Sequence, residues 1–223
     1  MNKKIYCTLD TETIGGVQFP QCAYHVGGII HDRQGNIIAS FNYLIAEFWE
    51  QIKNDSYAKK NFYKYKEMVE DGVATMCPTI EQAIAMVESL LSFYNVSTVM
   101  AFNSGFDIGR GACAPLVKNR DFVDLWLMAL QTLAIRKKYA TFCTEHNLKS
   151  STGKSCATNA QTFYAYLTEN PEYSEEHTAF EDSKIEMEIF LACVKTHKKF
   201  TQNCHVNDYP ARFRLYPKIG KKG

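Results

Sequence analysis

The order of the apolar segments is the feature that most constrains the fold of this chain. Residues 4–9 form an apolar run that ends at Asp10, and two further β-rich runs, 24–32 and 37–45, flank a Gly-Asn turn. This arrangement predicts a central strand followed by a β-hairpin. Short apolar strands are expected again at 97–102 and 121–123. Strands interleaved with helices predict an α/β fold with a mixed five-stranded sheet flanked by helices.

Helical periodicity fills the stretches between these strands. Residues 46–71 predict one broken helix or two short ones, and Thr79 with Gln82 forms a capping box before an apolar stripe at helical spacing. Ser104 is expected to cap a helix that begins at the turn after residue 102. Four more helices are expected near residues 125–135, 138–146, 159–168 and 178–198.

Composition excludes several classes of protein. The 223 residues are 46% hydrophobic, which suits one globular domain. The apolar runs are interrupted well before the roughly 20 residues that cross a bilayer. The eight cysteines include no Cys-x-x-Cys pair, which favours reduced, mostly buried thiols over a zinc site or disulfides. With no signal-peptide pattern at the N-terminus, these features predict a cytoplasmic protein.

The net charge of +1 conceals an asymmetry. Residues 195–223 carry +7 and the preceding residues −6. We therefore divide the chain into a domain at 1–198 and a basic tail at 199–223. Basic and aromatic residues interleave at 212–218, which suits single-stranded nucleic acid, although docking onto the body, onto a partner protein, or simple solubility would also explain the tail. The oligomeric state is open, and a homodimer is possible.

Two carboxylates stand at the end of the first strand. Side chains two apart on a strand share a face, so Asp10 and Glu12 lie side by side. Close carboxylates favour a hard cation such as Mg²⁺ or Mn²⁺. Two exposed charges at a strand end are the simpler alternative for this pair alone.

Two further acidic groups follow at element ends. Asn103, Phe106 and Asp107 come where a strand turns into a helix, a position that also suits Asp107 as a helix-start residue. Later, a capping box of Thr178 with Glu181 would begin a helix and leave His177 on the preceding loop, near an Asp182 anchored in the first turns. Loop histidines beside carboxylates can act as general bases. Glu181, Glu186 and Glu188 are expected on a solvated helix face.

With these residues in view, the sequence resembles the DnaQ-like 3′–5′ exonucleases of the DEDDh type, which have an RNase H-like fold. Asp10-Thr11-Glu12-Thr13 is similar to the first family motif, Asn103-x-x-Phe106-Asp107 to the second, and His177-x-Ala179-x-x-Asp182 to the third. The resemblance covers roughly residues 5–190. It departs from the family at Ile14, which stands in a segment that often reads Thr/Ser-Gly-Leu.

The resemblance implies a metal-dependent 3′–5′ exonuclease that releases nucleoside 5′-monophosphates from single-stranded DNA or RNA 3′ ends, with DNA favoured. It implies two Mg²⁺ or Mn²⁺ ions held by Asp10, Glu12, Asp107 and Asp182, with His177 as general base. It also implies that Thr13, Ile14, Asn103 and Phe106 bind substrate, although Phe106 could equally be a core residue. An exoribonuclease, an endonuclease on the same fold and a catalytically silent nucleic-acid-binding module are the alternatives.

Overall fold

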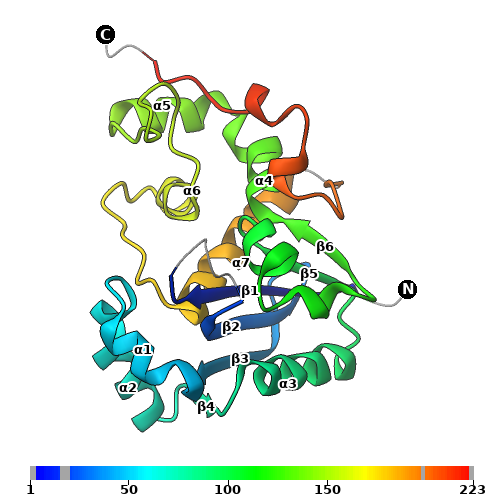
Figure 1. Ribbon diagram of the computed structural model, residues 1–223. Coiled ribbons are helices and arrows are strands. Elements are labelled where there is room, and N and C mark those ends of the chain that lie inside the picture. The colour runs from blue at the N-terminus through cyan, green and yellow to red at the C-terminus, as the bar shows by residue number, and fades with distance from the viewer. Residues whose placement is uncertain (1–3, 16–20, 197–198, 221–223) are drawn as a thin grey trace.

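The computed structural model describes residues 4–15, 21–196 and 199–220, and its centre is a six-stranded mixed sheet (Figure 1). The strand order is β4-β3-β2-β1-β5-β6. The strands are β1 (Ile5–Thr13), β2 (Ala23–Asp32), β3 (Ile37–Ile45), β4 (Thr75–Cys77), β5 (Thr98–Ala101) and β6 (Asp121–Asp124). The five strands predicted from the sequence are all present, and β4 is the sixth. Three residues are too few to show the alternation by which a strand is recognised.

The described residues form seven α-helices, of which α3 and α7 pack on the sheet. They are α1 (Trp49–Asn54), α2 (Phe62–Glu70), α3 (Ile80–Phe93), α4 (Leu125–Ala129), α5 (Lys137–Glu145), α6 (Ala160–Leu167) and α7 (Ala179–Thr196). The two short helices expected within 46–71 are α1 and α2. Thr79 caps α3 by accepting from the Gln82 N–H at 3.3 Å, as expected. The end of the last helix, expected at residue 198, lies outside the described residues.

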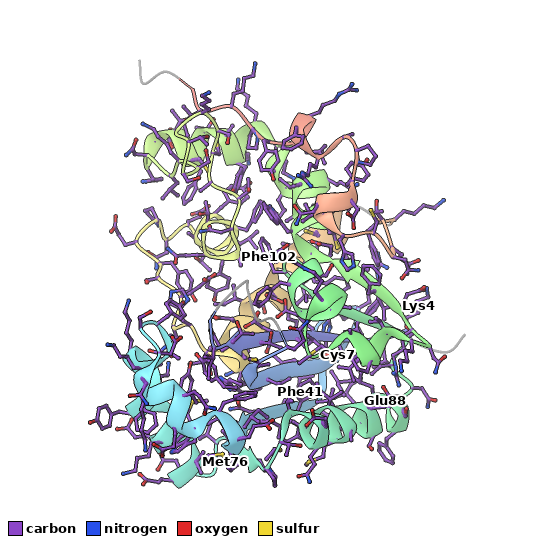
Figure 2. The ribbon with its side chains drawn as sticks, viewed as in Figure 1. Lys4, Cys7, Phe41, Met76, Glu88 and Phe102 are labelled. Carbon is purple, nitrogen blue, oxygen red and sulfur yellow. The ribbon has the colours of Figure 1, made fainter. Side chains whose placement is uncertain are left out.

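The two faces of the sheet bury different layers. Along β1 the side chains of Cys7 and Leu9 belong to the core shared with α3, whereas Tyr6 belongs to the core shared with α7. Figure 2 shows Cys7 and Phe41 on the side toward α3. Because strand side chains alternate, Asp10 shares the face of Tyr6 and lies on the side that α7 covers.

Helix α7 approaches the sheet closely at a glycine. A Cβ placed on Gly27 would lie 2.3 Å from the backbone nitrogen of Phe180, in the first turn of α7. Gly27 is the register partner of Asp10 in the β1–β2 ladder. Because Gly27 has no side chain, the first turn of α7 can pack against β2 beside Asp10.

The C-terminal segment packs against the body. Phe122 lies on the edge strand β6 and forms two hydrogen bonds with Asn203. The Asn203 N–H donates to the Phe122 carbonyl, and the Phe122 N–H donates to Asn203 Oδ1, both at 2.9 Å. Further along, Cys156 donates its N–H to the Pro217 carbonyl at 2.9 Å and Gly220 donates to Thr144 Oγ1 at 3.0 Å. Of the alternatives for this segment, docking onto the body is the one seen for residues 199–220, and the predicted boundary at residue 198 lies outside the described residues.

All eight cysteines are free in the structure, and six are buried, which confirms the expected burial of most of the thiols. Within the described ranges, no helix combines the length and apolar character needed to span a membrane.

Candidate active site

The first acidic pair lies on a part of β1 that projects beyond its neighbour. Residues Tyr6–Thr8 pair with β5, while pairing with β2 continues to Thr13. Asp10 and Glu12 are therefore at the open end of the sheet and are half-buried, whereas the alternate residues Thr11 and Thr13 are buried. The predicted side-by-side placement follows from this alternation.

The chain after β5 brings Asp107 to the same place. Asp107 is 1% exposed and lies in a π-helical turn, Gly105–Arg110, where it accepts a short hydrogen bond from the Thr11 hydroxyl. The expected Ser104 cap is wrong. The Ser104 hydroxyl instead donates to Asp124 Oδ2 at 3.0 Å and is 2.8 Å from His205 Nδ1, because the C-terminal segment packs over this turn.

His177 and Asp182 lie on either side of the start of α7, as expected, but the capping is different. The Thr178 hydroxyl is buried and has no hydrogen-bond partner in the described part of the chain. The first N–H of the helix, at Ala179, donates instead to Nδ1 of the buried His25 at 3.3 Å. The predicted Thr178–Glu181 capping box is therefore wrong, because contact with β2 supplies an acceptor from another strand.

The ring of His177 faces the carboxylates and a tyrosine. Its backbone is in the left-handed region, with φ 52°, and its carbonyl accepts from Asn61 Nδ2 at 2.9 Å and Tyr65 Oη at 3.2 Å. The His177 Nδ1 atom is 4.0 Å from Glu175 Oε2, and the ring meets that of Tyr57 edge-on at 5.9 Å. The imidazole is 46% exposed, so it is open to solvent at the rim of the site.

Electrostatics show that the acidic side chains are close neighbours. Burial raises the pKa of Glu12 to about 9, of Asp182 to about 8 and of Asp107 to about 7. Burial also raises the pKa of Asp10, and Asp107 is the strongest of the carboxylates that raise it further. Within the described residues, none of these four carboxylates forms an ion pair with a lysine or arginine.

A fifth carboxylate, Glu186, belongs to this cluster. It was expected on a solvated helix face, but it is 3% exposed and accepts from the Phe102 N–H at 3.2 Å. Burial raises its pKa, and Asp107 and then Asp182 raise it further. The expectation fails because α7 lies on the sheet at this turn. One helical turn separates Glu186 from Asp182, and that spacing was the available signal.

The donor set fits a divalent cation. Ligand atoms of Glu12, His177 and Asp182 lie within 4.8 Å of one another. Asp182 Oδ1 is buried and has no hydrogen-bond partner among the described residues, as expected for an atom that binds a cation. The carboxylate oxygens of Glu12 and Asp182 suit Mg²⁺ or Mn²⁺. Asp10 and Asp107 are not part of this group of three.

The predicted substrate-binding residues surround the same end of β1. Phe106 and Thr13 line a cavity of about 410 Å³ together with Glu12 and Tyr57. Ile14 is half-buried and packs on the core under α1 and α2. Asn103 has a left-handed backbone, with φ 60°, and its Oδ1 is buried without a partner in the described chain. Nothing in this geometry assigns these four residues a ligand.

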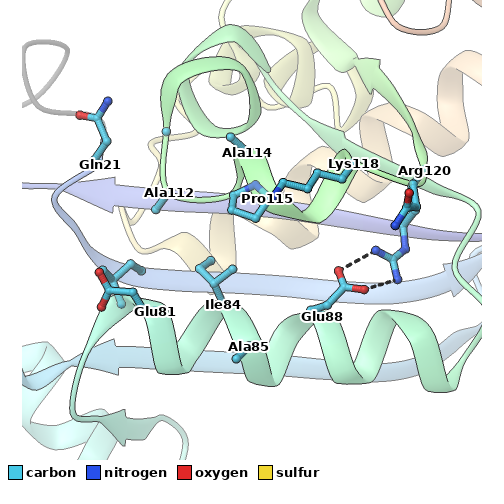
Figure 3. Close-up of a pocket in the computed structure, with 13 residues that line it drawn as sticks. Gln21, Glu81, Ile84, Ala85, Glu88, Ala112, Ala114, Pro115, Lys118 and Arg120 are labelled. Carbon is cyan, nitrogen blue, oxygen red and sulfur yellow. Dashed lines mark hydrogen bonds and ion pairs between the residues drawn. The ribbon is translucent and has the colours of Figure 1, made fainter.

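A larger cavity, about 770 Å³, lies between α3 and the turn Ala114–Val117 (Figure 3). Ile84, Ala85 and Pro115 line it, and the paired side chains of Glu88 and Arg120, with N–O distances of 2.7 and 2.9 Å, stand at one end. None of the clustered carboxylates lines this cavity, so its size does not make it the candidate site.

Comparison with known proteins identifies the fold. No family model matches the sequence, and no curated protein is similar enough in sequence to be recognised as a relative. Among solved structures, the chain resembles Escherichia coli exonuclease I in complex with a dA16 oligonucleotide, with a TM-score of 0.54. The fold is RNase H-like. The sequence identity is 12% over 88% of this chain, and the match spans 42% of the exonuclease I chain. The RNase H-like fold expected from the sequence is confirmed, with six strands instead of five.

Proposed function

We propose that this chain is a metal-dependent 3′–5′ exonuclease of the DnaQ-like type that hydrolyses phosphodiester bonds at the 3′ end of single-stranded nucleic acid, with DNA favoured. The observation that carries the proposal is the convergence of Asp10, Glu12, Asp107 and Asp182 beside His177. These residues come from three segments that are far apart in the sequence. The solved neighbour with an RNase H-like fold is an exonuclease bound to a single-stranded oligonucleotide, which supports the choice of substrate.

Asp10, Glu12, Asp107 and Asp182 would hold two Mg²⁺ or Mn²⁺ ions. Such ions, when bound, lower the pKa of an attacking water and stabilise charge on the leaving 3′ oxygen. The raised pKa values of the carboxylates and the unpartnered Asp182 Oδ1 support this assignment, because burial and neighbouring carboxylates outweigh the effect of any nearby lysine. His177 would remain outside the ligand set.

His177 is proposed as the general base. Glu175 lies on the Nδ1 side of its ring, which favours a proton on Nδ1 and leaves Nε2 to accept the proton of water. The exposure of the imidazole allows that proton to pass to solvent. Thr13, Ile14, Asn103 and Phe106 are proposed to contact the terminal nucleotide. The cavity that Thr13 and Phe106 line beside Glu12 supports this role for those two residues.

The test is a time course on 5′-labelled DNA and RNA oligonucleotides with Mg²⁺ or Mn²⁺ and with EDTA as control. We expect a ladder that shortens one nucleotide at a time from the 3′ end, faster on DNA, and no reaction in EDTA. Preferential shortening of RNA would identify an exoribonuclease. Internal cuts would identify an endonuclease, and binding without cleavage would identify a silent module.

A further inference from the structure

The helical segment between β3 and β4 is built against the candidate site. Its own small core includes Ile52, Ala58 and Tyr65, which pack with residues of β2 and β3. Asn61 and Tyr65 donate to the carbonyl of His177, so the segment is held directly beside the imidazole. The position of its surface relative to the carboxylates is therefore fixed by hydrogen bonds. Figure 1 shows α1 and α2 together at this end of the sheet.

In contrast to the acidic site beside it, this segment is rich in positive charge. Between residues 53 and 66 there are five lysines and four aromatic residues against a single acid, Asp55. Three of the lysines are paired: Lys53 with Glu50 at 2.6 Å, Lys64 with Glu176, and Lys66 with Glu70 at 3.5 Å. Within the described chain, Lys59 and Lys60 form no ion pair, and both are exposed.

An aromatic ring lies between Lys60 and the candidate site. Tyr57 is 46% exposed, meets the His177 ring at 5.9 Å and lines the cavity that contains Glu12 and Phe106. The Nζ atom of Lys60 lies 5.7 Å from the centre of the Tyr57 ring. The Tyr57 ring therefore contacts the candidate site on one side and the ammonium group of Lys60 on the other.

We propose that Tyr57, Lys59 and Lys60 form the binding surface for the single strand on the 5′ side of the bond that is cut. This inference rests on the proposed function. A base can stack on the exposed Tyr57 ring, and the two unpaired ammonium groups attract backbone phosphates without regard to sequence. Positive charge at the rim of an acidic site raises the local concentration of a polyanionic strand there.

The experiment measures binding of 5′-fluorescein-labelled oligo-dT of 2, 4, 8 and 12 nucleotides to the full chain by anisotropy. Ca²⁺ replaces Mg²⁺ to slow cleavage, and the salt concentration is varied. For Lys59→Gln/Lys60→Gln, we expect the loss of affinity to grow with length and the salt dependence of log Kd on the 12-mer to become shallower by about 1.4. Tyr57→Ala should weaken 12-mer binding at least about fivefold. Lys137→Gln/Lys138→Gln, an exposed pair on α5, is the charge-matched control.

Each part of the proposal has an outcome that would overturn it. Lysine variants that bind all lengths like the control pair would overturn the surface. Equal losses on the dinucleotide and the 12-mer in Tyr57→Ala would place that ring on the terminal nucleotide and overturn its assignment. If the unmodified chain binds strands with the expected length dependence but does not cleave them in Mg²⁺, the nuclease proposal fails while the surface stands.

Discussion

At the scale of single residues, the site consists of buried acidic side chains that form no ion pair with a lysine or arginine of the described residues. Asp10 and Asp182 lie in different motifs, yet the charge of Asp182 raises the pKa of Asp10 and that of Glu12. Replacing either by Asn keeps the shape and removes one charge. We expect Asp10→Asn and Asp182→Asn to lower the cleavage rate by about 10³-fold or more.

The measurement is the initial rate on a 5′-labelled single strand in Mg²⁺. Glu188→Gln, on an exposed position of α7, is the matched control and should retain normal activity. Activity within tenfold of the unmodified chain in either Asp variant would contradict the proposed ligand roles.

Glu186 permits a separate prediction about stability. In the metal-free protein its ionised form is disfavoured by burial and by Asp107, so Glu186→Gln should remove this unfavourable term. We expect Tm at pH 8 to rise by about 2–4 °C for each kcal/mol of this unfavourable free energy that is removed, with a smaller change at pH 5. A thermal melt in EDTA at both pH values checks this. Equal changes at both pH values would show that charge is not the cause.

At the scale of elements, the site depends on how closely α7 approaches β2. A methyl group on Gly27 would overlap the backbone of Phe180, and backbone cannot move as cheaply as a side chain. We expect Gly27→Ala to lower Tm and also to weaken Mn²⁺ binding, because the first turn of α7 carries Asp182.

Gly28→Ala is the matched control for this change. Its Cβ would meet the Phe41 ring at 2.2 Å on the opposite face, so it should also lower Tm, yet it does not displace α7. Calorimetric titration with Mn²⁺ separates the two variants. Unchanged Mn²⁺ affinity in a folded Gly27→Ala protein would show that this contact does not position the carboxylate.

At the scale of the whole molecule, stability and metal binding are linked through protons. Between pH 7 and 8.5 the carboxyl groups of the unfolded chain are already ionised, whereas in the folded state Glu12, Asp107 and Asp182 still release protons, with pKa values of about 9, 7 and 8. The folded state then binds more protons than the unfolded state, so its stability falls as pH rises.

We therefore expect Tm of the metal-free protein to fall between pH 7 and 8.5, and 10 mM or so of Mg²⁺ to restore more Tm at pH 8.5 than at pH 7. Melts with EDTA or Mg²⁺ at several pH values measure both effects. A metal-free Tm that rises over this range would be inconsistent with the buried acidic cluster.

The C-terminal segment also acts on the whole molecule. Val206 donates its N–H to the buried Asp124 carboxylate at 2.9 Å, and His205 contacts the buried Ser104 hydroxyl. Deleting residues 199–223 removes both contacts, each of which contributes about 1 kcal/mol to stability, and it uncovers the apolar side chains that Val206 packs against. We expect a large fall in Tm as well as weaker strand binding. A chain ending at Tyr209 retains both contacts and should lose less stability, and equal losses would contradict this role.

Much of this molecule follows from local pattern alone. The hairpin of β2 and β3, the capped start of α3 and the β1 pair Asp10 and Glu12 depend on turn residues, spacing and alternation, which act over a few positions. The same is true of the N-cap Asp124, which accepts from the Leu127 N–H at 3.1 Å. These features were predictable because their causes lie within one or two turns of the chain.

The features that the sequence did not reveal depend on contacts between distant segments. His25 accepts the N–H of Ala179 where a Thr178 cap was expected, and Glu186 is buried where a solvated face was expected. His205 of the C-terminal segment contacts the Ser104 hydroxyl, which was expected to cap a helix. Sequence by itself determined which acidic side chains stand at the ends of elements. Only the tertiary structure decided which of them share one desolvated space, because burial and charge repulsion arise when helices and strands pack, and no local spacing encodes that distance.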